Sequence, residues 1–174
     1  MKKLLLAVIV SLSTVTTAAL AEIKVGIILG FTGPIESLTP AMRDGARMAF
    51  DEASNSGNLL GGESITILEA DSTCVDSAAA TAAAEDLVAQ GVTAIMGADC
   101  SGVTGAINAN VAVPNGILMV SPSATSPGLS KVPDNGTFWR TAPSDAKGGQ
   151  VLAKLALSRG IESIAVTYTN NDYG

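Results

Sequence analysis

The sequence predicts an α/β fold of the doubly wound kind, in which apolar strands alternate with helices around a parallel sheet. Short apolar runs recur along the chain, separated by segments with helical periodicity or many small residues. The runs are continuous, as in strands that are covered on both faces, and several end in glycine or hydroxyl residues. The predicted strands or extended segments are 23–29, 65–68, 94–97, 117–120, 137–140 and 164–168.

Residues 1–21 predict a secretory signal. Lys2 and Lys3 precede an apolar run at 4–10, and Ala-Leu-Ala at 19–21 fits a cleavage site after Ala21. The run is too short to span a bilayer, and no cysteine stands at the cleavage point to carry a lipid. We therefore expect an exported, soluble mature protein.

Composition limits the function further. Removal of the signal leaves 153 residues with 8 basic and 16 acidic side chains, a net charge of −8. This length is sufficient for one domain with a core, and the charge argues against nucleic acid and anionic membranes. The chain has no histidine, which excludes Ser-His-Asp and Cys-His catalysis and removes the commonest transition-metal ligand. Neither a phosphate-binding loop motif nor G-x-S-x-G occurs, so we expect no enzyme, no cofactor and no metal site.

The helices between these strands are predicted from capping and periodicity. Thr39 is expected to be the N-cap of the first helix, with Pro40 at its first position. The Ala-rich segment 77–90 predicts a helix that lies close to the sheet, and Ser144 is expected to cap a helix over 145–158. The predicted buried face of the first helix consists of Met42, Ala46, Ala49, Phe50 and Ala53.

The loop after the first strand contains Gly30 and Gly33, but their spacing is not that of a dinucleotide-binding fingerprint. We expect these glycines to let the loop turn sharply over the sheet edge. Ile35 and its neighbours would then face a cleft.

Two further loops at the predicted carboxyl edge carry hydroxyl groups. Ser101 follows strand 94–97 and is expected to be the N-cap of a helix over 102–111, a helix start that attracts a carboxylate or phosphate. Ser123 and Thr125 follow strand 117–120, and their hydroxyl and carbonyl groups suit an ammonium group. The pair of loops therefore fits a small zwitterion. The alternative is that Ser101 only caps its helix and that 123–125 is an ordinary turn.

The two cysteines, Cys74 and Cys100, each follow a predicted strand at this same edge. In an exported chain such a pair favours a disulfide, with a metal site or a nucleophile as alternatives.

The pattern of strand and helix runs to the last residue, where a helix that should cover strand 164–168 is absent. We therefore expect this chain to be the front part of a longer one. Seven segments in order then resemble one family, the periplasmic branched-chain amino-acid (leucine/isoleucine/valine) binding proteins, which are solute receptors of ABC importers. These segments are IKVGIILGFTGP, DGARMAFDEAS, GNLLGGESITILEADSTC, GADCSGVT, GILMVSPSATSP, FWRTAPSD and NDYG.

The resemblance implies a type I periplasmic-binding-protein fold, with two Rossmann-like parallel-sheet lobes that close on a ligand. Residues 22–140 would form the first lobe, itself incomplete, and residues 141–174 the start of a truncated second lobe. The protein would be a periplasmic monomer that binds a leucine-, isoleucine- or valine-like zwitterion and delivers it to an ABC permease in the inner membrane.

The resemblance also assigns site residues. Ser101 matches the serine that binds the ligand carboxylate, and Ser123 matches a position whose backbone carbonyl receives the ammonium group. Ala124 lies between, Thr125 matches a threonine that contacts the amino acid through its hydroxyl and N–H, and Tyr173 matches an aromatic residue that closes over the ligand. Cys74 and Cys100 match the family's disulfide.

One departure widens the choice of ligand. Ser123 carries a hydroxyl where the leucine receptor has a methyl group, so a more polar ligand is possible. Relatives with this first lobe take up amides, urea or aromatic acids, which are the alternative ligands. A second alternative is a sensory ligand-binding domain joined to a signalling segment after residue 174.

Overall fold

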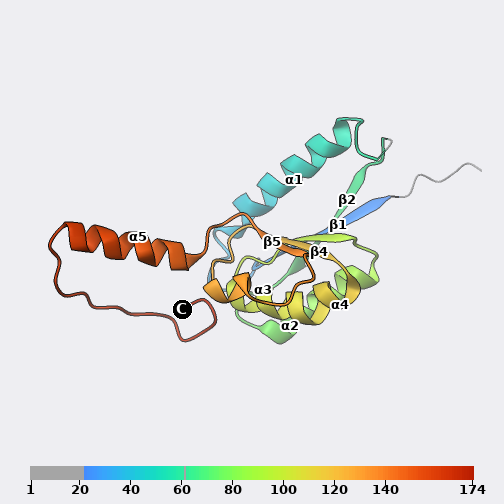
Figure 1. Cartoon of the computed structure of the whole chain (residues 1–174). Helices are drawn as coiled ribbons and strands as arrows, with labels where there is room; N and C mark the ends of the chain where they lie inside the picture. The colour runs from blue at the N-terminus through green and yellow to red at the C-terminus, as the bar shows by residue number, and fades with distance from the viewer. Residues whose placement is uncertain (1–21, 61) are drawn as a thin grey trace, which may run out of the picture.

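The computed structural model describes residues 22–60 and 62–174 of the chain (Figure 1). It contains a five-stranded parallel sheet with the strand order β2–β1–β3–β4–β5. The parallel sheet with helices on both faces confirms the predicted α/β class. The predicted signal at 1–21 lies outside the described residues. The strands are β1 (Ile23–Leu29), β2 (Ile65–Asp71), β3 (Ala94–Gly97), β4 (Leu118–Ser121) and β5 (Phe138–Arg140).

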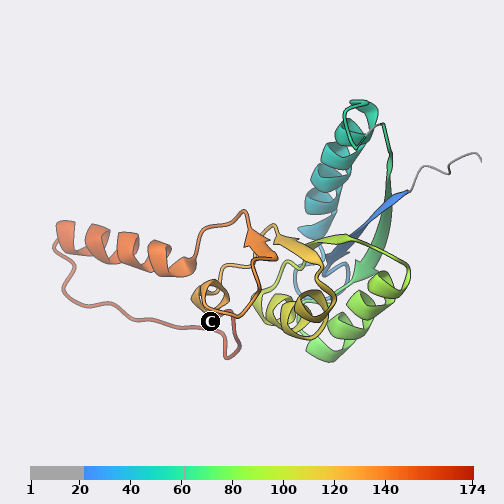
Figure 2. The same cartoon turned by 45° about the vertical axis from the view of Figure 1, so that its right-hand side comes forward.

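Helices lie on both faces of this sheet: α1 on one face, and α2 and α3 on the other (Figure 2). A π-helix (η1) and a short helix (α4) continue α3 without a break, so that one helical segment runs from residue 101 to residue 115. The helical elements are α1 (Thr39–Asn55), α2 (Ser77–Ala89), α3 (Ser101–Ile107), η1 (Asn108–Ala112), α4 (Val113–Asn115), the 3-10 helix η2 (Pro127–Ser130) and α5 (Asp145–Ser158).

The core lies between the sheet and the layer formed by α2 and α3. The alanines of α2 allow close packing here, since Ala80 and Ala84 are fully buried. Gly26 in β1 has a similar role, because a Cβ at this position would lie only 2.9 Å from Leu87 Cδ1. The largest fully buried apolar side chains are Ile27, Ile28, Leu29, Leu87, Ile95, Ile107 and Met119.

The other face of the sheet is covered only in part. α1 packs against β1 and β2, and the apolar side chains of Leu118 on β4 and Trp139 on β5 stay exposed. Because α1 packs mainly against β1 and β2 at one side of the sheet, its predicted buried face is half-buried at Met42, Ala46, Phe50 and Ala53. The prediction that Ala49 belongs to this buried face is wrong, since Ala49 is exposed.

Two predicted helix caps are wrong by one residue. α1 begins at Thr39 and takes Leu38 as its N-cap, while the Thr39 hydroxyl donates a hydrogen bond to the Glu36 carbonyl (3.1 Å). α3 likewise begins at Ser101 and takes Cys100 as its N-cap. In both cases the hydroxyl that the pattern assigns to the cap has another hydrogen-bond partner. The helix that Ser101 opens also runs four residues beyond the predicted end at 111.

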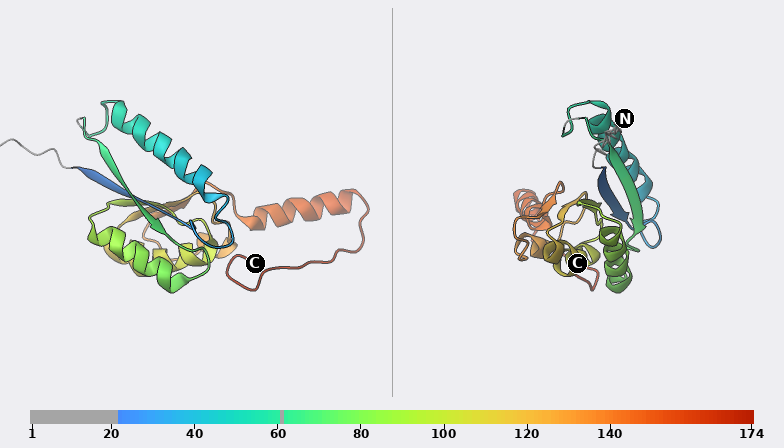
Figure 3. Two further views of the ribbon diagram at one scale, coloured as in Figure 1. Left: turned by 180° about the vertical axis from the view of Figure 1, so that it is seen from behind. Right: turned by 90° about the vertical axis from the view of Figure 1, so that its right-hand side faces the viewer.

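The C-terminal segment gives one correct and one wrong prediction. α5 spans the predicted residues 145–158, and the Ser144 hydroxyl accepts a hydrogen bond from Ala146 N–H (3.3 Å), as expected of its N-cap. Residues 164–168, predicted as a buried strand, instead belong to an extended segment outside the sheet. Val166 is 83% exposed. An apolar run needs neighbouring strands to form a ladder, and none lies beside this one in the described part of the chain (Figure 3).

None of the helices within residues 22–60 and 62–174 is long and apolar enough to cross a membrane.

Candidate functional site

A disulfide joins the loops that follow β2 and β3. Cys74 and Cys100 are bonded, with their Cα atoms 5.2 Å apart. The predicted pairing is therefore confirmed, and the metal and nucleophile alternatives for these cysteines are excluded. The bond fixes two loops at the carboxyl edge of the sheet against each other.

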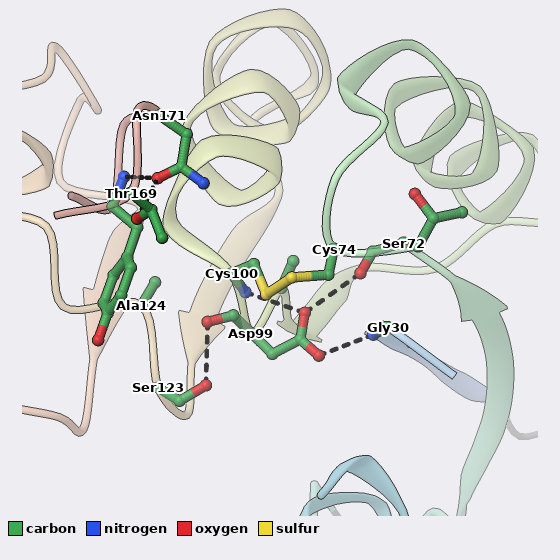
Figure 4. Close-up of a disulfide and its surroundings, with 12 residues drawn as sticks. Gly30, Ser72, Cys74, Asp99, Cys100, Ser123, Ala124, Thr169 and Asn171 are labelled. Atoms are coloured by element: carbon green, nitrogen blue, oxygen red, sulfur yellow. Dashed lines mark hydrogen bonds between the residues drawn. A yellow bond between two sulfur atoms is a disulfide. The ribbon is translucent and has the colours of Figure 1, made fainter. Parts of the chain in front are cut away.

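Asp99 links the loops at the same edge of the sheet through hydrogen bonds (Figure 4). Its Oδ2 accepts a hydrogen bond from Gly30 N–H at the end of β1 (2.7 Å), and its Oδ1 accepts from the Ser72 hydroxyl at the end of β2 (3.2 Å). Oδ1 also accepts from Cys100 N–H (2.9 Å). The Ser123 hydroxyl, after β4, donates to the Asp99 backbone carbonyl (2.9 Å). One residue, only 3% exposed, therefore links the loops that follow four strands.

A second aspartate holds the loop after β1 in place. Asp71 accepts hydrogen bonds from the Thr32 hydroxyl (2.6 Å) and from Thr73 N–H (2.8 Å). Partial burial alone would raise the pKa of Asp71, but these bonds, with weaker ones from Thr32 N–H and Phe31 N–H, lower its pKa below the usual value. Gly33 completes the turn at a φ of +100°, where a Cβ would lie 2.5 Å from the Thr73 carbonyl oxygen. The sharp turn expected of this loop is confirmed.

A cavity of about 680 Å³ lies at this edge of the sheet, next to the loops that the disulfide and Asp99 connect. One wall is apolar and comes from the loop before α1 and its first turns, which confirms the expectation that Ile35 faces a cleft. The opposite side carries polar groups from the loops after β2, β3 and β4. The chain returns from the far end of α5 toward this edge (Figure 1), and four residues of segment 169–173 contribute to the cavity lining. The cavity is lined by Pro34, Ile35, Leu38, Met42, Cys74, Val75, Ser77, Asp99, Cys100, Ser101, Gly102, Val103, Ser123, Thr169, Asn171, Asp172 and Tyr173.

Three of the predicted ligand-binding residues, Ser101, Ser123 and Tyr173, meet at this cavity. Ser101 is buried, and its hydroxyl accepts a hydrogen bond from Ser126 N–H (3.1 Å) instead of capping α3. This contact connects the start of α3 with the loop after β4. The two hydroxyl-bearing loops are thus neighbours, as the parallel-strand argument required.

The other two predicted residues, Ala124 and Thr125, are not part of the cavity lining. Ala124 is fully buried, and its carbonyl accepts a hydrogen bond from Arg140 Nη1 (3.1 Å). The Thr125 hydroxyl donates to Asp145 Oδ2 (2.7 Å), and the Thr125 carbonyl accepts from Asp145 N–H (3.0 Å). Thr125 therefore connects the loop after β4, of which it is part, to the start of α5.

Sequence reasoning missed the residues that position these loops. Asp99 and Arg140 bring together groups that are far apart in the chain, and Arg140 Nη1 also donates to the Ser126 carbonyl (2.8 Å). The sequence offered one signal for Asp99: an acidic residue directly between an apolar strand and a cysteine can be buried at the sheet edge.

The charges at the cavity are all negative. The lining includes the acidic residues Asp99 and Asp172 but no lysine or arginine. Within the described residues, no group of three or more His, Cys, Asp or Glu side chains could hold a metal ion. The site offers hydroxyls, the backbone N–H groups of a first helical turn and an apolar wall, which together can hold a small polar solute.

Comparison with known proteins agrees with this architecture. A family described as periplasmic binding protein matches residues 22–174. The chain belongs to this family. It is 30% identical over 173 residues to the Leu/Ile/Val-binding protein BraC3 of Rhizobium johnstonii, an alignment that covers 99% of this chain and 46% of that protein. The chain thus spans about half the length of the curated relatives that it matches.

Solved structures show the same fold. The branched-chain amino acid transporter substrate binding protein LivJ from Streptococcus pneumoniae, in complex with isoleucine, has a TM-score of 0.64 and 31% identity, over 72% of this chain and 35% of that one. A solute binding protein of an ABC transporter from R. palustris, in complex with 4-hydroxybenzoate, has a TM-score of 0.65 over 80% of this chain and 37% of that one. Its identity of 22% supports the shared fold alone. The fold is therefore the type I periplasmic-binding-protein fold that the sequence resemblance implied.

Proposed function

We propose that this chain forms the first lobe, and the start of the second, of a periplasmic receptor that binds a branched-chain or related amino acid for an ABC importer. The role is binding and not catalysis. The family membership and the Leu/Ile/Val-binding relatives support this proposal. Leucine is the leading ligand, with isoleucine and valine next.

The observation that carries the proposal is the meeting of Ser101 and Ser123 at a cavity with an apolar wall. The hydroxyl of Ser101 and the N–H groups of the first helical turn suit a carboxylate, while hydroxyl and carbonyl oxygens of the loop after β4 suit an ammonium group. Ile35, Leu38 and Met42 would contact the apolar side chain of the solute.

The assignment of the lobes is part of the proposal. Residues 22–140 contain the whole described sheet, and α5 in the segment 141–174 has no buried residue. We place the boundary between the lobes at residues 140 and 141, with residues 1–21 as a signal that is cleaved after Ala21. A second lobe would supply the rest of the cleft, with further contacts to the ammonium group and to the side chain of the solute.

The mechanism would be capture followed by closure. The open monomer takes up the solute in the periplasm, the lobes close over it, and the closed form docks on the permease. Uncharged groups can hold a charged solute in this way because a dry, preorganised cleft strengthens each hydrogen bond. Thr125 lies at the junction with α5, where its contacts with Asp145 would change as the lobes move.

A ligand screen tests this function. The receptor with its second lobe is heated in the presence of single amino acids, amides, urea or aromatic acids, and each ligand that raises the melting temperature is measured by calorimetry. We expect leucine, isoleucine or valine to give the largest shift, with no turnover of the ligand. Stabilisation by urea or an aromatic acid alone, or conversion of the ligand into a product, would contradict the proposal.

A further inference from the structure

Asp99, one of the residues that line the cavity, has a buried carboxylate. Asp99 is almost completely buried, and its carboxylate receives three hydrogen bonds, from Gly30 N–H, the Ser72 hydroxyl and Cys100 N–H. All three donors are neutral. The two salt bridges found in residues 22–60 and 62–174 are Arg43–Asp44 and Arg47–Glu69, so neither involves this carboxylate.

The rest of the cavity does not compensate this charge. Asp172 is a second acidic residue in the lining, and none of the lining residues is basic. Asp172 comes within 3.6 Å of the position of a Cβ built on Gly102, in the first turn of α3. A solute at the start of this helix would therefore lie near two acidic residues.

Net charge should then separate two classes of small solute, amino acids and carboxylic acids. An amino acid brings an ammonium group together with its carboxylate, whereas a carboxylic acid such as a hydroxybenzoate brings only negative charge. A charge on a buried group acts over a longer distance than an exposed one, because little water lies around it.

We propose that Asp99 is a specificity-determining residue, whose buried carboxylate makes the site prefer solutes that carry an ammonium group over acids that lack one. This inference rests on the proposed function of the cavity. It adds to the structural role of Asp99, because linking the loops after β1, β2, β3 and β4 would affect every ligand equally, whereas its charge affects them differently.

Two analogues of leucine test the preference in the receptor with its second lobe. 4-Methylpentanoate keeps the side chain and the carboxylate of leucine but lacks the ammonium group, and 3-methylbutylamine keeps the side chain and the ammonium group but lacks the carboxylate. Calorimetry gives the ratio of their dissociation constants. We expect the amine to bind about tenfold more tightly than the acid or better. An acid that binds as tightly as the amine overturns the inference.

Asp99→Asn assigns the preference to this residue. The substitution removes the charge but keeps the shape, although the amide nitrogen must now face one of the three donors. We expect the amine-to-acid ratio to fall by about tenfold in this variant. The matched control is Asp86→Asn, which removes one exposed carboxylate from α2 and should leave the ratio unchanged. Equal weakening of both analogues by Asp99→Asn would show a purely structural role and overturn the inference.

The outcomes for this inference and for the proposed function are distinct. Leucine that binds with no preference between the amine and the acid contradicts the role of Asp99 alone. Failure of every amino acid to bind contradicts the proposed function and this inference together. If Asp99→Asn does not fold, the comparison of the two analogues on the unsubstituted receptor still decides against the inference whenever the acid binds as well as the amine.

Discussion

Residues 22–140 and residues 141–174 both contain apolar runs and helical segments. They differ in whether these elements are paired and buried. In the first region each apolar run becomes a strand with a neighbour, and the loops after these strands are fixed by a disulfide and by Asp99. In the second region α5 has no buried residue, and the apolar run at 164–168 pairs with nothing described. The comparison shows that an apolar run determines a strand only when other strands lie beside it.

A pair of leucines tests this contrast with the largest expected effect. Leu87 is 1% exposed in α2, whereas Leu152 is 67% exposed in α5. In the chain 22–174, Leu87→Ala should lower the free energy of unfolding by about 2–5 kcal/mol, because it leaves a cavity in the core. Leu152→Ala should change it by less than about 0.5 kcal/mol. Urea denaturation measures both, and equal effects of the two substitutions would contradict the described difference in burial.

Removal of the disulfide is expected to have the next largest effect. Cys74 and Cys100 are 26 residues apart in the sequence. Opening a loop of this length should cost about 3 kcal/mol of stability, mainly because the unfolded chain gains freedom. The double substitution Cys74→Ser and Cys100→Ser should lower the urea midpoint as much as reduction does. A reductant should then have no further effect on the double variant. An unchanged midpoint would show that the other bonds at this edge are sufficient.

The loops after β3 and β4 give a smaller effect, on binding. In the receptor with its second lobe, Ser101→Ala and Thr125→Ala should each weaken amino-acid binding by roughly 1–3 kcal/mol. Ser101→Ala removes a hydroxyl at the cavity, and Thr125→Ala removes one that the proposed closure would turn from Asp145 toward the ligand. Ser158→Ala, which removes an exposed hydroxyl at the end of α5, is the control. Unchanged affinity by calorimetry in both site variants would remove this site assignment.

The smallest expected effect concerns pH. The hydrogen bonds to Asp71 lower its pKa in the folded protein, so its contribution to stability is present above the unfolded value of about 4 and is lost as the pH falls through the folded pKa. Between pH 6 and pH 3 the parent chain should therefore lose more stability than Asp71→Asn does. The difference should be less than about 1 kcal/mol, because water screens this partly exposed group. Urea midpoints across this range measure it, and parallel curves would contradict the assigned hydrogen bonds.

The sequence predicted the fold to the extent that local pattern decides it. The five strands of the sheet, the Ala-rich α2 and the Ser144 cap follow from features within a few residues. The cysteine pair follows from the predicted export and from the position of both cysteines after strands at one sheet edge. Thr39 and Ser101 were each assigned to a cap one residue late. In both cases a hydroxyl near a helix start has another hydrogen-bond partner, which no local pattern shows.

The location of the candidate site could be predicted from the sequence. The hydrogen bonds that hold its loops in place could not. Parallel strands place their carboxyl ends at one edge, so the meeting of Ser101 with the loop after β4 could be expected. Asp99 could not be assigned in this way, because its three donors come from Gly30, Ser72 and its own neighbour, Cys100. Thr125 was assigned to the ligand by resemblance, and its bond to Asp145 places it at the junction with α5.

The most direct test is a crystal structure of the receptor, with its second lobe, in complex with leucine. We expect the leucine carboxylate to lie within hydrogen-bond distance of Ser101 and the first turn of α3, and the ammonium group to lie against the loop after β4. Leucine bound away from these two loops would contradict the central claim.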